Sequence, residues 1–193
     1  MALTESYQAA TETLLTAEQF LPVAGELGRA ELIAGRVRTT SPGGGSHGFD
    51  GYDLMMELGG WVRQHNLGRG SLAETGFLLS RDPDTVRAPD WAFIKADRVP
   101  PEFSPAFVEI VPDMVLEISS PSDRRAAVME KVGAWLDAGV AVVWVLFLAQ
   151  RCLVEYRPDG WVRRFAEDDT LVCEDLLEGF AVRLADVLRP LKG

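Results

Sequence analysis

The architecture of this chain is best read outward from one apolar run, Asp113-Met114-Val115-Leu116-Glu117-Ile118-Ser119. Side chains alternate between the two faces of a β-strand, so the even-numbered residues of the run share one face, which is wholly apolar. Glu117 and Ser119 share the other face. Because an unpartnered carboxylate is costly to bury, the run predicts a core strand whose acid has a partner or holds a cation.

The residues on either side of this run predict further helices and strands. Apolar residues recur at helical spacing over 47–65 and 122–138, and shorter helices are expected at 16–22 and 184–188. Strands are expected over 29–40, as two strands around Ala34-Gly35, and over 72–79, 86–94, 140–148, 153–156 and 161–165. The helices are too few to wind twice around a parallel sheet. We therefore predict an α/β (α+β) sandwich, with a central mixed β-sheet flanked by helices, an N-terminal β-hairpin and a C-terminal β-hairpin extension.

Capping and breaking residues predict where the helices begin and end. These residues are Thr16 as N-cap and Pro22 near the end for the first helix, Gly68 and Gly70 after the second, and Ser122 or Asp123 as N-cap for the third.

Length and composition bound the class of protein. A chain of 193 residues that is 47% hydrophobic and 25% charged is long enough for one substantial core and short for two. We expect one domain over 16–190, after a variable segment at 1–15. The longest uncharged apolar stretch, 138–149, is too short to cross a bilayer, and no export signal opens the chain, so a cytoplasmic location is expected. Cys152 and Cys173 are expected to be reduced packing residues.

The charge of the chain opposes one obvious class of partner. A formal net charge of −10 works against binding to nucleic acid, because such binding depends on neutralising phosphates. The acids crowd the last part of the chain, whereas many arginines, such as Arg36, Arg63 and Arg87, lie in the first two thirds. Charge alone therefore leaves the substrate open.

Asp90 and Glu117 are the acids best suited to a shared site. Asp90 follows the segment Val86-Arg87-Ala88-Pro89 and enters an apolar run. If the two strands are neighbours, both carboxylates meet at one point, and such oxygen ligands suit Mg²⁺ or Mn²⁺. Lys131 flanks the apolar stripe of its helix, so its ammonium can reach the sheet and offset charge in a transition state. Each residue alone also has an ordinary explanation: Lys131 could lie along the helix edge with its amine in water.

His47 opens the first long helix, where backbone N–H groups favour anions. It could contact a phosphate or the metal site, or it could serve only as a cap. The segment Gly44-Gly45-Ser46-His47-Gly48 matches the nucleophile elbow of serine hydrolases. The only other histidine, His65, lies in the same predicted helix and cannot act as the base, so that function is excluded. A P-loop is excluded because its Gly-Lys-Ser/Thr ending is missing.

Taken together, these residues resemble the restriction-endonuclease-like superfamily, whose PD-(D/E)XK motif runs Pro-Asp, then Asp or Glu, one residue, then Lys. Within it the chain resembles a bacterial family of uncharacterised restriction endonucleases that often occur in many copies per genome. The resemblance covers nearly the whole chain from about Thr16. The matching segments are 31–35, 41–42 with His47, 75–77, 86–90, 112–123, Lys131, 138–140, 143–145, 156–160 and 179–180.

The resemblance implies that Asp90 and Glu117 bind the metal ion, Mg²⁺ or Mn²⁺, and that Glu31 is a supporting acid. The motif lysine, expected two residues after Glu117, is Ser119 in this chain. The resemblance implies that Lys131 supplies the amine from the following helix instead. The substrate contacts that it implies are His47, Arg87 and Ser119.

Two functions stay open. The first is a Mg²⁺-dependent endonuclease that hydrolyses phosphodiester bonds of DNA, with Asp90, Glu117, Lys131 and Glu31 as catalytic residues. The second is a binding or regulatory module that keeps the nuclease fold with little activity and acts through a partner. The acidic charge favours the second, and the retained site residues favour the first. A homodimer is expected on the single ground that a duplex has two strands to cut.

Overall fold

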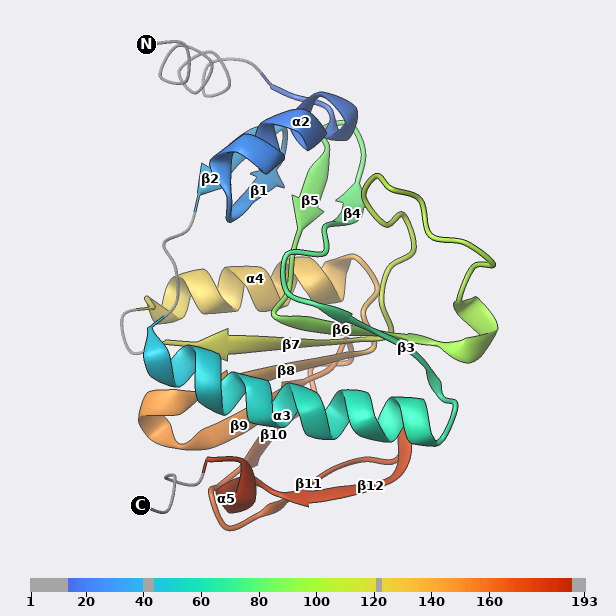
Figure 1. Cartoon of the computed structure of the whole chain (residues 1–193). Helices are drawn as coiled ribbons and strands as arrows, with labels where there is room; N and C mark the ends of the chain where they lie inside the picture. The colour runs from blue at the N-terminus through green and yellow to red at the C-terminus, as the bar shows by residue number, and fades with distance from the viewer. Residues whose placement is uncertain (1–13, 40–43, 121–122, 189–193) are drawn as a thin grey trace. The chain divides into compact units, whose positions relative to one another are not determined.

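The computed structural model describes residues 14–39, 44–120 and 123–188. These residues form two compact units (Figure 1). Unit 1 comprises residues 14–39, 73–89 and 100–111, and unit 2 comprises residues 44–72, 90–99, 112–120 and 123–188. The single domain expected over 16–190 stays a prediction. The expected N-cap Ser122 and most of the expected variable segment 1–15 lie outside the described residues.

Unit 1 is a four-stranded antiparallel sheet with one helix. Its strands lie in the order β2-β1-β5-β4. Its elements are α2 (Ala17–Leu27), β1 (Ala30–Ile33), β2 (Arg36–Thr39), β4 (Phe77–Ser80) and β5 (Thr85–Arg87). The predicted N-terminal hairpin is confirmed, since β1 and β2 pair along their whole length. They turn at Ala34 and Gly35, which both have positive φ.

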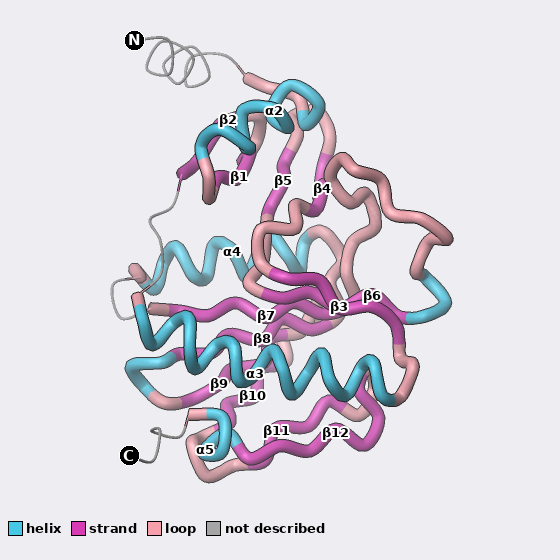
Figure 2. The backbone as a smooth tube through the Cα atoms, viewed as in Figure 1, coloured by secondary structure: helices cyan, strands magenta, loops and turns pink. Residues whose placement is uncertain are grey.

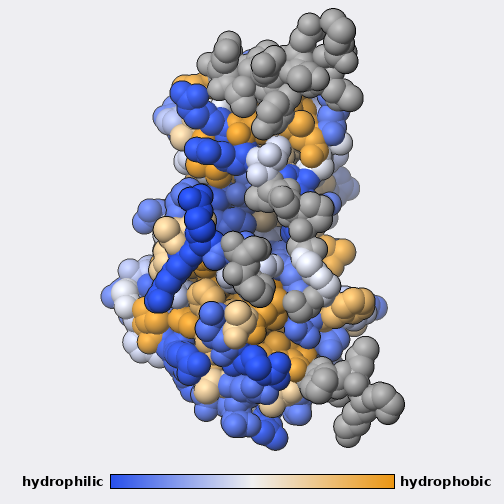
Figure 3. Space-filling model, turned by 90° about the vertical axis from the view of Figure 1, so that its left-hand side faces the viewer, coloured by the Kyte–Doolittle hydropathy of each residue, from blue (hydrophilic) through white to orange (hydrophobic). Residues whose placement is uncertain are grey.

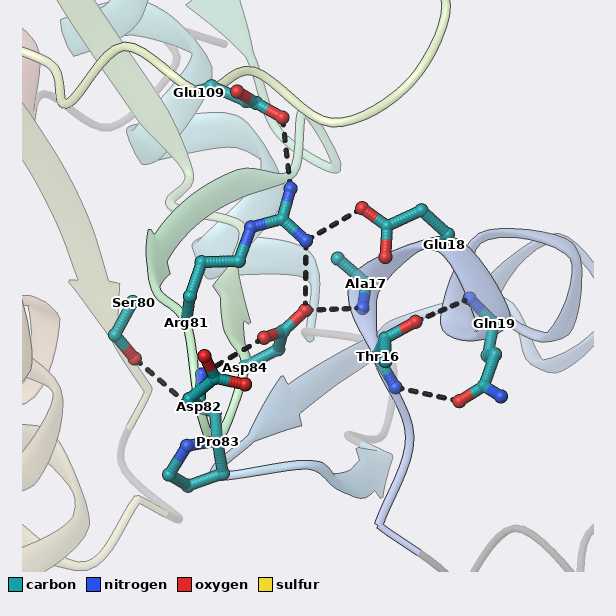
Figure 4. Close-up of polar contacts among 10 residues, drawn as sticks. All are labelled: Thr16, Ala17, Glu18, Gln19, Ser80, Arg81, Asp82, Pro83, Asp84 and Glu109. Atoms are coloured by element: carbon teal, nitrogen blue, oxygen red, sulfur yellow. Dashed lines mark hydrogen bonds and ion pairs between the residues drawn. The ribbon is translucent and has the colours of Figure 1, made fainter.

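The start of α2 is tied to the turn between β4 and β5 by polar contacts (Figure 4). Thr16 and Gln19 form a capping box, which confirms Thr16 as the N-cap. Asp84 accepts a hydrogen bond of 2.7 Å from the Ala17 N–H. The guanidinium of Arg81 pairs with three carboxylates, those of Glu18, Asp84 and Glu109. These contacts fix where the helix begins.

The prediction that α2 ends near Pro22 is wrong, because the helix continues to Leu27 with Pro22 inside it. A proline in a helix removes one backbone hydrogen bond. Burial outweighs this cost here: Phe20 is 1% exposed and belongs to the core cluster of unit 1, together with Ala17, Leu32, Val37, Leu78 and Val86.

Unit 2 is built on a six-stranded mixed sheet with the order β10-β9-β8-β7-β6-β3. Strands β7 and β8 run parallel, and the other neighbouring pairs run antiparallel. The strands are β3 (Gly68–Leu72), β6 (Trp91–Lys95), β7 (Met114–Ser119), β8 (Val142–Phe147), β9 (Cys152–Tyr156) and β10 (Val162–Phe165). The other elements are α3 (Gly45–Gln64), α4 (Arg125–Asp137), the hairpin of β11 (Thr170–Cys173) and β12 (Leu177–Arg183), and α5 (Leu184–Val187). The predicted mixed sheet flanked by helices and the predicted β9–β10 hairpin are confirmed.

The two long helices cover opposite faces of this sheet (Figures 1 and 2). Leu54 and Leu58 of α3 belong to the same core cluster as Leu116 of β7. On the other face, the indole of Trp135 of α4 donates a hydrogen bond to Glu117. All six residues of β7 are buried. Because Leu116 packs on the α3 side and Glu117 meets α4, the predicted alternation of an apolar face and a face that carries Glu117 is observed.

Helix α3 approaches β7 closely at one glycine. Gly51 is buried, and a Cβ atom at this position would lie 2.2 Å from Cδ1 of Ile118. A larger residue would displace Ile118 or push the helix away from the sheet.

Two segments expected as continuous strands are divided between separate sheets. The segment 72–79 contributes its first residue to β3 and its last three to β4, and the segment 86–94 contributes to β5 and β6. Pro89 explains the second break, because proline lacks an N–H and restricts the residue before it. Gly68 and Gly70 lie in β3 and do not end α3. A Cβ atom at Gly68 would lie 2.0 Å from the Ile94 carbonyl oxygen, so the close pairing of β3 with β6 explains this glycine.

The helix ends differ from the predicted ones by a few residues. α4 begins after Arg124, because the carboxylate of Asp123 instead accepts a hydrogen bond of 2.7 Å from the Ser120 N–H. α3 begins at Gly45, two residues before His47. The β11–β12 hairpin was not predicted. Its strands contain several polar residues and carry little periodic signal.

The two cysteines and the helices agree with the remaining expectations. Cys152 and Cys173 are free and buried, as predicted. Over the described ranges, the structure contains no helix of the length and apolar character that a membrane span requires.

Candidate active site

The pairing of β6 with β7 brings Asp90 to Glu117. The antiparallel register joins Trp91 to Leu116 and Ala92 to Val115. Continued by one residue beyond the start of β6, the same register sets Asp90 opposite Glu117. Side chains directly opposite one another on antiparallel strands project from the same face, with Cβ atoms about 4.5–5.5 Å apart. The neighbouring strands on which the sequence prediction depended are thus present.

Asp90 is buried and held in its charged form. Its Oδ2 accepts a hydrogen bond of 2.8 Å from the Ile118 N–H, and its Oδ1 lies 3.6 Å from Nε2 of His47. Burial acts to raise the pKa of Asp90. The hydrogen bonds from His47 and Ile118 and the positive charges of His47 and Lys131 outweigh burial, so the pKa lies below its ordinary value of 3.8. A carboxylate that stays ionised in the core is what a cation ligand requires.

Glu117 is buried on the same face and has two donors from α4. Its Oε1 accepts a hydrogen bond of 2.8 Å from the indole N–H of Trp135, and its Oε2 lies 3.2 Å from Nζ of Lys131. These donors are four residues apart, so they project from the same side of α4. Lys131 therefore points toward the sheet, as its place beside the apolar stripe predicts. Its side chain keeps 30% exposure.

Ser119 lies two residues after Glu117 on the same face of β7 and is buried. The structure thus pairs Asp90 with His47 and Glu117 with Lys131, and the register of β6 with β7 brings the two pairs together. The Ser119 hydroxyl lies on the same face of the strand as Glu117.

Glu31 and Arg87 belong to unit 1, where they pair with each other. The carboxylate of Glu31 lies 3.0 Å from Nη1 of Arg87 and accepts a hydrogen bond of 3.2 Å from the Ala88 N–H. Both side chains are buried. The roles expected for Glu31 as a supporting acid and for Arg87 as a substrate contact stay predictions.

Trp135 is the site residue that the sequence prediction missed. Its spacing from Val128 and Val132 indicates only a place on the apolar stripe of α4, and it is fully buried. The signal that could have revealed its second role is its indole N–H, because a buried tryptophan usually finds an acceptor for that group.

Asp113 is an acid of the same run as Glu117, but it does not belong to the site. Its carboxylate accepts hydrogen bonds from the Lys95 N–H at 2.8 Å and from the Arg98 guanidinium at 2.7 Å. These contacts give Asp113 a structural role.

The donor set at this site fits a hard divalent cation. Asp90 and Glu117 offer carboxylate oxygens, and Mg²⁺ typically takes one or two carboxylates while keeping several waters. In the part of the chain that the structure describes, no group of three or more His, Cys, Asp and Glu residues is placed to hold a metal ion. A cation with an all-protein shell, such as structural Zn²⁺, does not fit these residues. Asp90 and Glu117 are thus the residues that could hold such a cation, beside the ammonium of Lys131.

Comparison with known proteins gives a family and a fold. The chain matches the model of the Uma2 family, described as "Putative restriction endonuclease", over residues 17–186. It matches none of the curated proteins. Among solved structures it is similar to that of "a putative nuclease belonging to DUF820 from Anabaena variabilis ATCC 29413", with a TM-score of 0.74 and 19% sequence identity. That similarity covers 90% of this chain and 97% of the other.

At this identity the solved structure shows a shared fold, which agrees with the restriction-endonuclease-like architecture expected from the sequence. The family match extends over most of the chain and includes Asp90, Glu117 and Lys131. This protein therefore belongs to the Uma2 family of putative restriction endonucleases.

Proposed function

We propose that this protein is an endonuclease that hydrolyses phosphodiester bonds of DNA in the cytoplasm, with Mg²⁺ or Mn²⁺ held by Asp90 and Glu117. The observation that carries the proposal is the β6–β7 register, which sets two buried carboxylates opposite each other, with Lys131 3.2 Å from one of them. Family membership supports nuclease-like chemistry in general.

Each residue of the site has a proposed role. A bound cation would polarise the phosphate and stabilise the leaving oxygen. Lys131 orients the attacking water and offsets the charge that develops on the phosphate, since Glu117 holds its ammonium and its side chain is partly exposed. His47 keeps Asp90 ionised and can meet a phosphate oxygen. The Ser119 hydroxyl contacts the substrate on the same face.

Two further roles rest on the sequence resemblance. Glu31 is proposed as a supporting acid and Arg87 as a substrate contact. Their pairing at 3.0 Å means that Arg87 can meet a phosphate only while it also satisfies Glu31.

The second candidate function is a nuclease-fold binding module with little activity. The observation that favours it is the net charge of −10, which opposes tight binding to a polyanion. Under this alternative, a partner protein would supply the cationic contacts to DNA, and the Asp90–Glu117 pair would still bind a cation.

A cleavage assay separates the two functions. The purified chain is incubated with supercoiled plasmid and with single-stranded DNA in Mg²⁺, Mn²⁺ or chelator, beside Asp90→Asn, Glu117→Gln and Lys131→Met. We expect cation-dependent cleavage by the wild type and loss of cleavage in all three variants. Cleavage that survives in Asp90→Asn and Lys131→Met would remove the site assignment.

Glu155→Gln is a matched control for Glu117→Gln. Glu155 is also a buried glutamate of the same sheet, and it also accepts a hydrogen bond from a tryptophan, Trp144, at 2.9 Å. We expect Glu155→Gln to keep cleavage per folded molecule. Binding of Mg²⁺ or Mn²⁺ by the wild type with no cleavage of either DNA would favour the binding module.

A further inference from the structure

One face of α3 exposes large apolar side chains. Phe49 is 76% exposed, Tyr52 56% and Met56 55%. Figure 3 looks onto the end of unit 2 at which α3 begins and shows apolar residues exposed there among hydrophilic ones. Two aromatic side chains exposed to this degree leave on the order of 250 Å² in water. This area is near that of the largest apolar patch on a typical monomer, and such a patch is often functional.

These three residues belong to a longer set, here called the α3 stripe: Phe49, Tyr52, Met56, Gly60 and Arg63. At 3.6 residues per turn, the five positions fall within an arc of about 80° of the helix. All five are exposed. The buried residues Leu54, Leu58 and Val62 lie on the opposite side, against the sheet. The core of unit 2 therefore does not account for the apolar character of the stripe.

We propose that the α3 stripe is the interface of a homodimer, in which α3 packs antiparallel against α3 of a second copy about a twofold axis at Met56. In this arrangement each position meets the position equally distant on the other side of Met56. Phe49 then meets Arg63 of the other copy, Tyr52 meets Gly60, and Met56 meets Met56. A twofold interface of this kind requires one surface to complement itself.

The stripe meets that requirement at each pair. The Tyr52 ring fills the space that Gly60 leaves on the facing helix, as a large residue packs into a hole between helices. The guanidinium of Arg63 covers the ring of Phe49 in a cation–π contact. Two flexible methionines pack on the axis, where each must meet its own copy. The small residue and the cation lie in the C-terminal half, and the aromatic rings lie in the N-terminal half, so only the antiparallel direction pairs them.

A second copy of the chain fits this surface better than DNA does. The stripe carries one cation, Arg63, and the neighbouring α3 positions carry the acids Asp50, Asp53 and Glu57. These acids oppose phosphate, whereas in a dimer they lie at the rim in water. A contact of one helix pair is small for a stable complex, so we expect a reversible dimer with a Kd on the order of micromolar or weaker.

Sedimentation equilibrium of the full chain over a range of concentrations tests the proposal. We expect a monomer–dimer equilibrium between the chain mass of 21.2 kDa and twice that mass. Met56→Glu should abolish the dimer, because it sets two carboxylates against each other on the axis. Leu72→Glu is the matched control, since Leu72 of β3 is 74% exposed and lies outside the stripe. The control should dimerise like the wild type.

A second variant distinguishes a dimer that depends on shape complementarity from non-specific apolar association. No atom lies within 4 Å of where a Cβ at Gly60 would be, so Gly60→Leu is compatible with the folded monomer. It adds apolar surface but fills the hole that Tyr52 needs, so the proposed dimer should weaken. Association that strengthens in Gly60→Leu would overturn the proposal.

A cross-link tests the axis directly and does not depend on a disruptive variant. Met56→Cys should form a disulfide between copies on mild oxidation, while Leu72→Cys should not; the native cysteines are both buried. A wild type that is monomeric up to its highest soluble concentration would refute the dimer. A Met56→Glu variant that still dimerises would also refute it. If the wild type is a monomer and Met56→Glu loses DNA binding, the stripe binds DNA and the proposed dimer is wrong.

Discussion

The substitution Trp135→Phe tests the candidate site through a residue that holds Glu117 in place. In the structure, Trp135 is fully buried and donates the 2.8 Å hydrogen bond to Glu117. Loss of a hydrogen bond to a charged acceptor costs about 1.5–3 kcal/mol. The smaller ring leaves a gap that costs roughly another 1–2 kcal/mol. We therefore expect a loss of roughly 2.5–5 kcal/mol in the free energy of unfolding, or about 5–20 °C in Tm.

The same change should weaken cation binding if the proposed site is correct. Residues that orient a metal ligand typically contribute about 10–100-fold to metal affinity. A cation at ten times its Kd should stabilise the wild type by about 1.4 kcal/mol. In Trp135→Phe, the concentration of Mg²⁺ or Mn²⁺ needed for the same rise in Tm should be about 10–100-fold higher. Thermal unfolding against cation concentration measures both effects.

Trp144→Phe is the control, because Trp144 is also fully buried and donates at 2.9 Å to the buried Glu155. We expect a similar loss of stability in this variant, with the cation dependence of the wild type. If both variants shift the cation midpoint equally, Glu117 is not the ligand that Trp135 orients. If Trp135→Phe unfolds at the wild-type temperature, the hydrogen bond does not contribute as reasoned.

The remaining predictions concern the stability of the two units. Asp90 has a lowered pKa in the folded state, so its charge contributes to the free energy of unfolding above about pH 4. This contribution should be lost as the pH falls below 3.8 toward the folded pKa. Urea unfolding against pH measures the loss, and Asp90→Asn should remove that part of the acid dependence. Gly51→Ala should be less stable than Gly48→Ala by about 1–3 kcal/mol, because a Cβ at Gly51 meets Ile118 at 2.2 Å while one at Gly48 meets nothing within 4 Å; equal stability would contradict the close approach of α3 to β7. Glu31→Gln should destabilise the fold by about 3 kcal/mol, because it leaves the buried Arg87 beside a neutral amide, and an unchanged denaturation midpoint would show that the pair adds nothing.

Local patterns predicted the parts of the site that depend on one element at a time. The alternation of β7 indicated which face carries Glu117, and the helical phase of α4 indicated that Lys131 reaches the sheet; both are observed. The two long helices, strands β7 and β8 and the β9–β10 hairpin followed from the same kind of signal, whereas β3 and the β11–β12 hairpin did not.

Contacts between distant segments could not be read in this way. Asp90 meets Glu117 only because β6 pairs with β7 in one particular register, and the sequence allowed that pairing without specifying it. The contact of His47 with Asp90 depends on where α3 lies over the sheet. The division of 86–94 into two strands of different units depends on the packing of each unit, although Pro89 was a local sign of the break.

Ile118 has a place in the structure that links α3 to the site. Its side chain meets α3 at Gly51, and its N–H donates to Asp90 at 2.8 Å. Because packed cores transmit small displacements, a slide of α3 along the sheet would reach the carboxylate through Ile118 as well as through His47 of α3 itself. A change on the outer surface of α3 that displaces the helix is therefore expected to alter the hydrogen bonds that position Asp90.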